Sequence, residues 1–204
     1  MTEAVIQFKY ALRPATPGAA AAAATLAPLL QDAQALGVMG RDPDRYDGLA
    51  FGNLSFGPAA GSGFWITATQ TADQPILNEE SVVLIKDWSI ADNSLHAAGR
   101  RPPSSETLSH AAIHGRRSGL HTWVLHGHAP TLWARARTAS ESGPWTVTSP
   151  RAANGTVAMA RAIAAATTGA SGLIVMGGHQ DGVIAYGPDA AAVLALLTSV
   201  LEAT

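Results

Sequence analysis

Apolar and polar residues alternate in several short segments of the chain, which is the pattern of strands with one buried face. In residues 4–10, Ile6, Phe8 and Tyr10 share one face of the expected strand. The segment at residues 49–56 is also strand-like but is interrupted by glycine and asparagine. The other strands predicted from this pattern are residues 64–69, 82–88, 123–125, 172–176 and 183–186.

Helices are predicted from their start signals and from alanine-rich or amphipathic runs. Thr16 and Pro17 open a helix expected over residues 15–36, in which Pro28 predicts a kink or an early break. The Ser104-Ser105-Glu106 sequence opens a second helix to about residue 115. Two further helices are predicted at residues 154–168 and 189–201, and loops are predicted at residues 37–48, 89–103 and 130–150.

These elements indicate a mixed α/β protein. Strands and helices do not alternate strictly, and several strands are joined by tight turns. This order favours a largely antiparallel or mixed sheet with helices on its faces over a doubly wound parallel sheet. The chain has 204 residues, 47% of them hydrophobic, so it can bury a full-sized core. No long polar linker divides it, and residues 1–204 are predicted to form a single domain.

Composition narrows the classes of partner and of metal site. The net charge is −2 and no basic run is present, which argues against nucleic acid or an anionic membrane as a partner. The chain has no cysteine, so a bound metal would need imidazole and carboxylate ligands. No apolar run approaches the roughly 20 residues that span a bilayer, and no signal peptide is recognisable. A cytoplasmic location is therefore expected.

The first candidate for chemistry is a pair of histidines at the end of an apolar strand. His126 and His128 follow residues 123–125, and Gly127 lies between them. Residues i and i+2 of a strand point to the same face, so the two imidazoles are expected side by side. They could form half of a zinc or similar divalent site, or else a hydrogen-bonded core pair or an exposed pair. His121 has the opposite parity and should face away from them.

Three other segments carry weaker signals. Ser104, Ser105 and Glu106 offer free backbone N–H groups, hydroxyls and a carboxylate at a helix start, although a plain capping motif has the same appearance. His179 lies in a glycine-rich turn after an apolar strand, where it is aimed into a pocket or exposed. Gly52-Asn53 and Thr69-Gln70 could bring backbone and amide groups to a ligand, or could simply form a bulged strand.

Taken in order, these segments resemble the class II aldolase/adducin family. The matching segments are GNLSF at residues 52–56, FWITATQ at 64–70, RRPPSSETLSH at 100–110, HGH at 126–128 and GGHQDGVIAYG at 177–187. The resemblance extends from about residue 15 to the C-terminus. Residues 1–14, which contain the first predicted strand, are an addition to it.

The resemblance implies a three-layer α/β/α domain that assembles into a tetramer with active sites between subunits. It implies that His126, His128 and His179 hold a divalent cation, most commonly Zn²⁺, with Mn²⁺ or Co²⁺ as alternatives. Glu106 would be the catalytic base. His110, four residues after Glu106, is a further ligand candidate or a buried histidine bonded to the backbone.

The resemblance also implies where a substrate would bind. In family members that use sugar phosphates, positions matching Gly52, Asn53, Thr69, Ser104 and Ser105 hold the phosphate. Gln70 stands where glycine is usual, so its amide would either fill this pocket or recognise another group such as a carboxylate. No tyrosine matches the proton donor of some relatives, which leaves Tyr46 and Tyr186 as the candidates.

The function expected from these residues is that of a metal-dependent lyase. Three neutral imidazoles leave coordination positions open for the carbonyl and hydroxyl of a small, sugar-derived substrate, and a nearby carboxylate can carry the proton. Aldol cleavage or decarboxylation through a metal-stabilised enediolate is the leading hypothesis. The alternatives are an epimerase or dehydratase on the same site and a non-catalytic, adducin-like binding or assembly module.

Overall fold

The computed structural model describes residues 6–14, 17–59, 63–138 and 143–203. Most of the strands belong to one large sheet, and two short ones form a separate pair. The strands are β1 (Lys9–Arg13), β2 (Gly40–Arg41), β3 (Ala50–Phe51), β4 (Asn53–Gly57), β5 (Phe64–Thr67), β6 (Val82–Ser89), β7 (Ser94–Ala98), β8 (Thr122–His128), β9 (Thr146–Val147), β10 (Gly172–Val175) and β11 (Gly182–Gly187).

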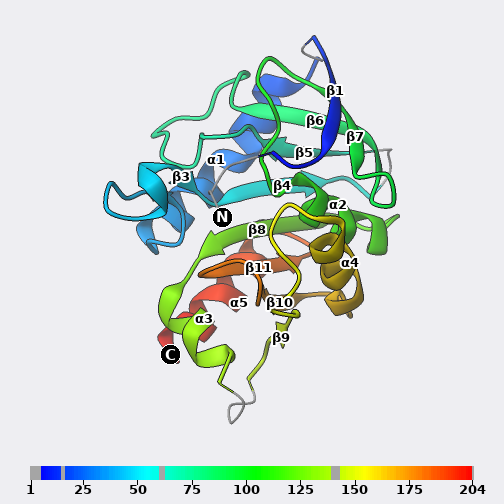
Figure 1. The fold of residues 1–204 in the computed structure, drawn as a ribbon. Coiled ribbons are helices and arrows are strands. Elements are labelled where there is room, and N and C mark those ends of the chain that lie inside the picture. Colours follow the sequence, from blue (N-terminus) through cyan, green and yellow to red (C-terminus); the bar gives the residue numbers. More distant parts are fainter. Residues whose placement is uncertain (1–5, 15–16, 60–62, 139–142, 204) are drawn as a thin grey trace.

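The described residues form a nine-stranded sheet in the order β1-β7-β6-β5-β4-β8-β11-β10-β9, with β2 and β3 paired separately (Figure 1). Neighbouring strands are antiparallel except for the pairs β1–β7 and β9–β10, which are parallel. The sheet is therefore mixed and mainly antiparallel, as predicted. The helices are α1 (Ala19–Ala35), α2 (Thr107–Arg116), α3 (Pro130–Ala136), α4 (Val157–Ala166), α5 (Ala190–Glu202) and the short 3-10 helix η1 (Tyr46–Gly48).

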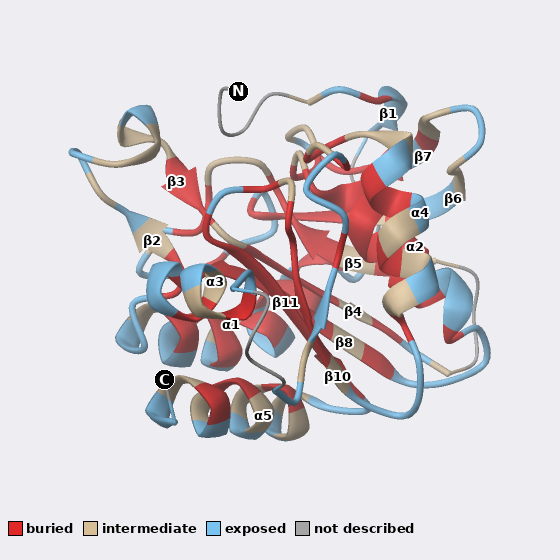
Figure 2. Cartoon of the chain, turned by 60° about the horizontal axis from the view of Figure 1, so that its bottom comes forward, coloured by how far each residue is buried: buried red, intermediate tan, exposed pale blue. Residues whose placement is uncertain are grey.

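Helices cover both faces of the sheet. Buried residues of α1, α3 and α5 pack with one set of strand side chains, and those of α2 and α4 pack with the other set. Figure 2 shows the buried residues concentrated along the strands and on the helix faces turned toward them. The predicted α/β fold with helices on both faces of a mixed sheet is confirmed.

The central strand β8 is buried on both faces. Val124 packs in the core beneath α2 and α4, Leu125 packs in the core beneath α1 and α5, and each is fully buried. Burial of a side chain of this size contributes roughly 1.5–3 kcal/mol. Because β8 also pairs with β4 on one edge and β11 on the other, its C-terminal end is held firmly in place.

The N-terminal strand lies later in the chain than predicted. Its alternating pattern placed it at residues 4–10, whereas β1 begins at Lys9; Ala4 and Val5 lie outside the described residues. All five residues of β1 are exposed, and within the described residues the strand pairs only with β7 at the sheet edge. Pairing with β7, rather than burial of an alternating face, therefore sets its limits.

Regular elements also occur in all three segments that were expected to be loops. Residues 89–103 contain β7, in which Leu95 and Ala97 are buried; alanine is a weak strand former and gave little signal. Residues 130–150 contain α3, whose first residue is a proline, and β9. Residues 37–48 contain β2 and η1.

The starts of two helices differ from the predictions. The start of α1 is Ala19, after Gly18 at φ 100°, while Thr16 lies outside the described residues. The helix runs on through Pro28, so the predicted early break is wrong. A proline inside a helix costs about 3 kcal/mol, and burial of apolar side chains along α1 offsets that cost. Glu106, rather than a serine, is the N-cap residue of α2.

The described part of the chain contains no helix long and apolar enough to cross a membrane.

Candidate metal centre

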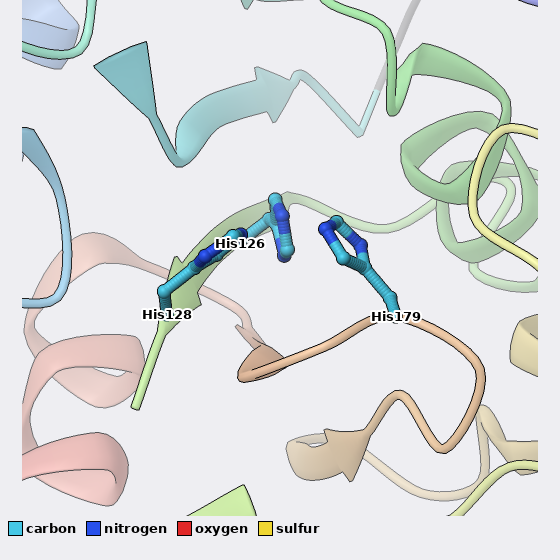
Figure 3. A group of neighbouring side chains, drawn as sticks. All are labelled: His126, His128 and His179. Atoms are coloured by element: carbon cyan, nitrogen blue, oxygen red, sulfur yellow. The ribbon is translucent and has the colours of Figure 1, made fainter. Parts of the chain in front are cut away.

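Two of the three predicted metal ligands end strand β8. His126 and His128 point to the same face of the sheet, as their spacing predicts (Figure 3). His121 is exposed ahead of the strand. Gly127 between them allows the loop after α1 to cross the strand closely. A Cβ atom at this glycine would lie 2.7 Å from the carbonyl oxygen of Val38, and the same oxygen accepts a hydrogen bond of 2.8 Å from the His128 N–H.

The third ligand comes from the turn that joins β10 to β11. The His179 N–H donates to the carbonyl oxygen of Met176, and the His179 carbonyl accepts from the Gly182 N–H. Gly177 and Gly178 pack directly on the backbone of residues 148–152, where a Cβ atom would collide. The turn therefore requires glycine at both positions, and it directs the imidazole of His179 toward the other two (Figure 3).

The three imidazoles form a compact buried group. Ring centroids are 5.3 Å apart for His126 and His128, and 5.0 Å apart for each of these with His179. One ring nitrogen from each residue lies within 4.8 Å of the others, and no ring is more than 3% exposed. The spacing and burial of these nitrogens suit a single divalent ion.

The chemistry of the donors also fits a metal. The Nδ1 atom of His126 lies 3.0 Å from the Val183 carbonyl oxygen, to which it donates as N–H. This bond fixes the tautomer with the proton on Nδ1 and makes Nε2 the nitrogen that could ligate a cation, an arrangement common around metal-bound histidines. The buried histidine triad could therefore bind a metal, with positions left over for a substrate.

Glu106 lies beside the triad. Its side chain is buried, and one carboxylate oxygen is 3.7 Å from Nδ1 of His179. The other carboxylate oxygen accepts a hydrogen bond of 2.8 Å from the hydroxyl of Ser109, one turn further along α2. The structure thus brings the predicted base to the predicted ligands, although the four residues come from three separate segments of the chain.

The six residues expected to bind substrate also come together. Gly52, Asn53, Thr69, Gln70, Ser104 and Ser105 line one small polar cavity of about 10 Å³. Gln70 has a φ of 57°, in the left-handed region, and its amide bonds both the N–H and the carbonyl of Ala50 at 3.0 Å. The side chain of Gln70 therefore helps to close this cavity.

Sequence reasoning missed a polar group beside the triad. The Tyr46 hydroxyl donates to Asp181 at 2.7 Å, Arg45 bonds both Asp181 and the Tyr46 hydroxyl, and the Tyr46 ring meets His128 edge-on at 4.4 Å. Tyr46 had been named only by default, in a loop without a recognisable motif. Asp181 could have been found, because it follows His179 by two residues in the glycine-rich turn.

A pocket of about 670 Å³ opens next to this group. Arg45, Tyr46 and His179 are among the residues that line it, together with Asp44, Asp47, Trp133, Pro150, Asn154, Gly177, Gly178 and Gln180. The other tyrosine candidate, Tyr186, is buried elsewhere, and its hydroxyl donates to the Thr168 carbonyl at 2.7 Å.

His110 makes a side-chain contact in place of the backbone bond that was expected. Its Nδ1 lies 2.7 Å from the hydroxyl of Ser55, which also lies 2.9 Å from Nε2 of His114. Burial without a charged partner lowers the pKa of His110 to about 3. Burial, followed by the nearby His110 and Arg117, lowers the pKa of His114 as well. Both side chains are therefore neutral structural groups at neutral pH.

A family model matches the part of the chain that contains the candidate site. Residues 42–204 match the family model described as "Class II Aldolase and Adducin N-terminal domain". Among solved structures, the chain is similar to a sugar-phosphate aldolase from Thermotoga maritima, with 16% identity, a TM-score of 0.56, and coverage of 88% of this chain and 93% of that one.

A second similar structure is the N-terminal class II aldolase domain of a conserved protein from Thermoplasma acidophilum. It has 15% identity and a TM-score of 0.56, and the match covers 85% of this chain and 89% of that one. At these identities the two structures show a shared fold. A comparison with curated protein sequences gives no significant match. The family model spans most of the chain and includes the whole candidate site, so the protein belongs to the class II aldolase and adducin family.

Proposed function

We propose that this protein is a divalent-metal-dependent lyase of the aldolase type that acts on a small, sugar-derived hydroxy-carbonyl compound. The family and fold support a metal-dependent, aldolase-like function. The observation that carries the proposal is the set of three buried imidazole nitrogens within 4.8 Å of one another, with the Glu106 carboxylate 3.7 Å from one of these rings.

In this proposal His126, His128 and His179 are the metal ligands and Zn²⁺ is the expected ion, because imidazole suits zinc and the site is small and buried. A bound divalent ion would supply Lewis-acid stabilisation of the negative charge that develops on a substrate oxygen. The hydrogen bond from Nδ1 of His126 to the Val183 carbonyl would keep that ring oriented as a ligand.

Glu106 is the proposed base. The Ser109 hydroxyl holds one of its carboxylate oxygens, which fixes the direction of the other oxygen toward His179. A carboxylate in this position can remove a proton from a hydroxyl or from a carbon next to the carbonyl, and can return it after the carbon–carbon bond breaks. Burial of Glu106 excludes water from this transfer.

The proposed binding residues are Gly52, Asn53, Thr69, Gln70, Ser104 and Ser105, which surround the small cavity near Glu106. Their amide and hydroxyl groups can donate hydrogen bonds to oxygen atoms of the substrate. By analogy with the family, we further propose a homotetramer with the active sites between subunits.

Metal analysis tests the first part of the proposal. Wild-type protein, His128→Ala and His121→Ala are purified by gel filtration, incubated with Zn²⁺, desalted and measured by elemental analysis. About one ion per chain is expected in the wild type and in His121→Ala, because His121 is exposed outside the site, and far less in His128→Ala. Failure of the wild type to retain any divalent ion would refute the metal-dependent reaction.

Product analysis tests the second part. Short hydroxy-ketones and hydroxy-keto acids are incubated with the metal-loaded wild type, and the products are followed by NMR in deuterated water. Cleavage to two carbonyl fragments, or release of carbon dioxide, supports a lyase. Inversion of a carbinol centre, or loss of water, with the carbon skeleton intact would instead assign an epimerase or a dehydratase.

A further inference from the structure

Two spaces adjoin the candidate metal centre, and they differ greatly in size and charge. Building on the proposed function, we infer that the substrate is an uncharged polyhydroxylated carbonyl compound, a free sugar rather than a sugar phosphate. Its hydroxylated portion occupies the pocket between the Arg45–Tyr46 loop and the His179 turn.

The small cavity beside Gln70 has no room for a phosphate. Its volume of about 10 Å³ is close to the minimum that holds one water molecule. A phosphate group presents several oxygen atoms around phosphorus and needs considerably more space than one water. A single hydroxyl, or one water that bridges to the substrate, fits this cavity.

The Gln70 side chain is held in its closed position. Its amide oxygen accepts from the Ala50 N–H at 3.0 Å and from Arg41 at 3.4 Å, and its amide nitrogen donates to the Ala50 carbonyl at 3.0 Å. A residue other than glycine is uncommon at the φ of 57° adopted here. These hydrogen bonds favour that conformation, and withdrawal of the side chain to admit a phosphate would break all of them.

The arginines near the site already have partners. Arg41 bonds Asp73 at 2.6 Å and the Gly48 carbonyl at 2.6 Å, and Arg45 bonds Asp181 at 3.0 Å. Arg101 donates to the Thr69 carbonyl at 3.1 Å. Arg41 and Arg45 are each paired with a carboxylate, which leaves less positive potential for a doubly charged phosphate, while the bond from Arg101 to a neutral carbonyl only fixes its position.

The wide pocket favours hydroxyl groups. Its volume of about 670 Å³ accommodates a sugar, and its lining includes the carboxylates of Asp44 and Asp47 and the amides of Asn154 and Gln180. Carboxylates accept hydrogen bonds from hydroxyl groups and repel phosphate, and the arginine of this lining, Arg45, is already paired with Asp181, so the pocket selects against the charged form of a ligand. Amides donate and accept, which suits a chain of alternating hydroxyl groups.

One wall of the wide pocket is a fixed aromatic ring. The Trp133 indole N–H donates to the Met176 carbonyl at 2.8 Å, and the guanidinium of Arg137 lies 4.1 Å from the ring centroid. These two contacts hold the indole in place beside the pocket that it lines. A rigid aromatic surface among polar groups suits the C–H faces of a sugar, whose edges carry hydroxyls.

A matched pair of ligands tests the inference. Binding of D-xylulose and of D-xylulose 5-phosphate to Zn²⁺-loaded wild-type protein is measured by isothermal titration calorimetry. The free ketose is expected to bind at least about tenfold more tightly than the ester. Equal or tighter binding of the ester would overturn the inference and leave the proposed lyase intact.

Two variants locate the cause of the preference. Gln70→Gly opens the small cavity and is expected to strengthen binding of the ester by about tenfold, so that the ratio of the free-ketose affinity to the ester affinity falls. Asp47→Asn removes a carboxylate from the wide pocket and should reduce the preference for the free ketose over the ester. Asp32→Asn changes an exposed residue outside the pocket and should leave that preference unchanged. If the ratio of free-ketose to ester affinity is unchanged in both Gln70→Gly and Asp47→Asn, the roles inferred for the small cavity and the wide pocket are contradicted.

The experiments distinguish failure of the proposed metal-dependent reaction from failure of the inferred substrate class. Protein that retains no divalent ion refutes the metal-dependent reaction whatever it binds. Protein that retains the ion, but binds neither ketose, overturns the inferred substrate class. Metal content and calorimetry therefore separate the two conclusions.

Discussion

We predict that the free energy of unfolding falls at acidic pH because His110 is buried in the folded protein. This imidazole is fully buried on α2, between the sheet and the helix layer, with the Ser55 hydroxyl 2.7 Å from its Nδ1. Its pKa is about 3 in the folded protein, against 6.5 for the unfolded chain. Between these two values the unfolded state binds a proton at this residue and the folded state does not.

The sign and size of the effect follow from this difference. Because the unfolded state binds more protons, the free energy of unfolding falls as the pH drops through 6.5 and continues to fall to about 3. At pH 5, one and a half units below the unfolded pKa, the loss attributable to His110 is about 2 kcal/mol relative to pH 8. A loss of this size is a large fraction of the stability of an ordinary domain.

Urea denaturation at pH 8, 6 and 5 measures the effect. Wild type and His110→Asn are compared with a chelator present, so that contributions common to both proteins cancel in the difference between them. Asparagine keeps a polar group near Ser55 but does not titrate. The stability of the variant at pH 8 is expected to be lower, while its further loss between pH 8 and pH 5 should be smaller by about 2 kcal/mol. Parallel pH profiles for the two proteins would refute the assignment to His110.

Three other predictions concern the centre and its assembly. Glu106→Gln should retain about one metal ion per chain by elemental analysis and lose roughly 10²–10⁴-fold in turnover, and full activity would exclude the proposed base. Gly127→Ala places a Cβ atom 2.7 Å from the Val38 carbonyl oxygen and should lower the free energy of unfolding by about 1–3 kcal/mol. Gly115→Ala, whose Cβ would have ordinary contacts in α2, is the matched control and should be neutral or stabilising. Light scattering after gel filtration should give about four times the mass of one chain, and a monomeric mass with full activity would contradict sites between subunits.

The features that sequence predicted best are those set by local geometry. Alternation along β8 placed His126 and His128 on one face, and the turn before β11 placed His179 at the end of a strand. These inferences need only the repeat of a strand and the conformational freedom of glycine. The family resemblance was needed to connect Glu106 and His179 to that pair, because nothing local joins the three segments.

The features that were missed depend on contacts between distant residues. Arg45 and Tyr46 reach Asp181 across more than a hundred residues of sequence. The pattern of apolar and polar residues along the chain does not indicate which distant side chains will be in contact. The weak strand β7 and the short helix α3 were missed for a similar reason, since alanine, proline and isolated apolar residues acquire their structure from the sheet and core on which they pack.

The order of the ligands along the chain determines when the centre can form. Strand β8 carries two of them, but it pairs with β4, already synthesised, and with β11, which follows more than fifty residues later. A nascent chain that ends before His179 presents only two of the three imidazoles. Ribosomal synthesis proceeds toward the C-terminus, so the hairpin of β10 and β11 emerges after the other described strands of the sheet. The three-histidine site therefore forms only after β11 has paired with β8, and metal acquisition is expected to follow formation of the sheet rather than guide its collapse.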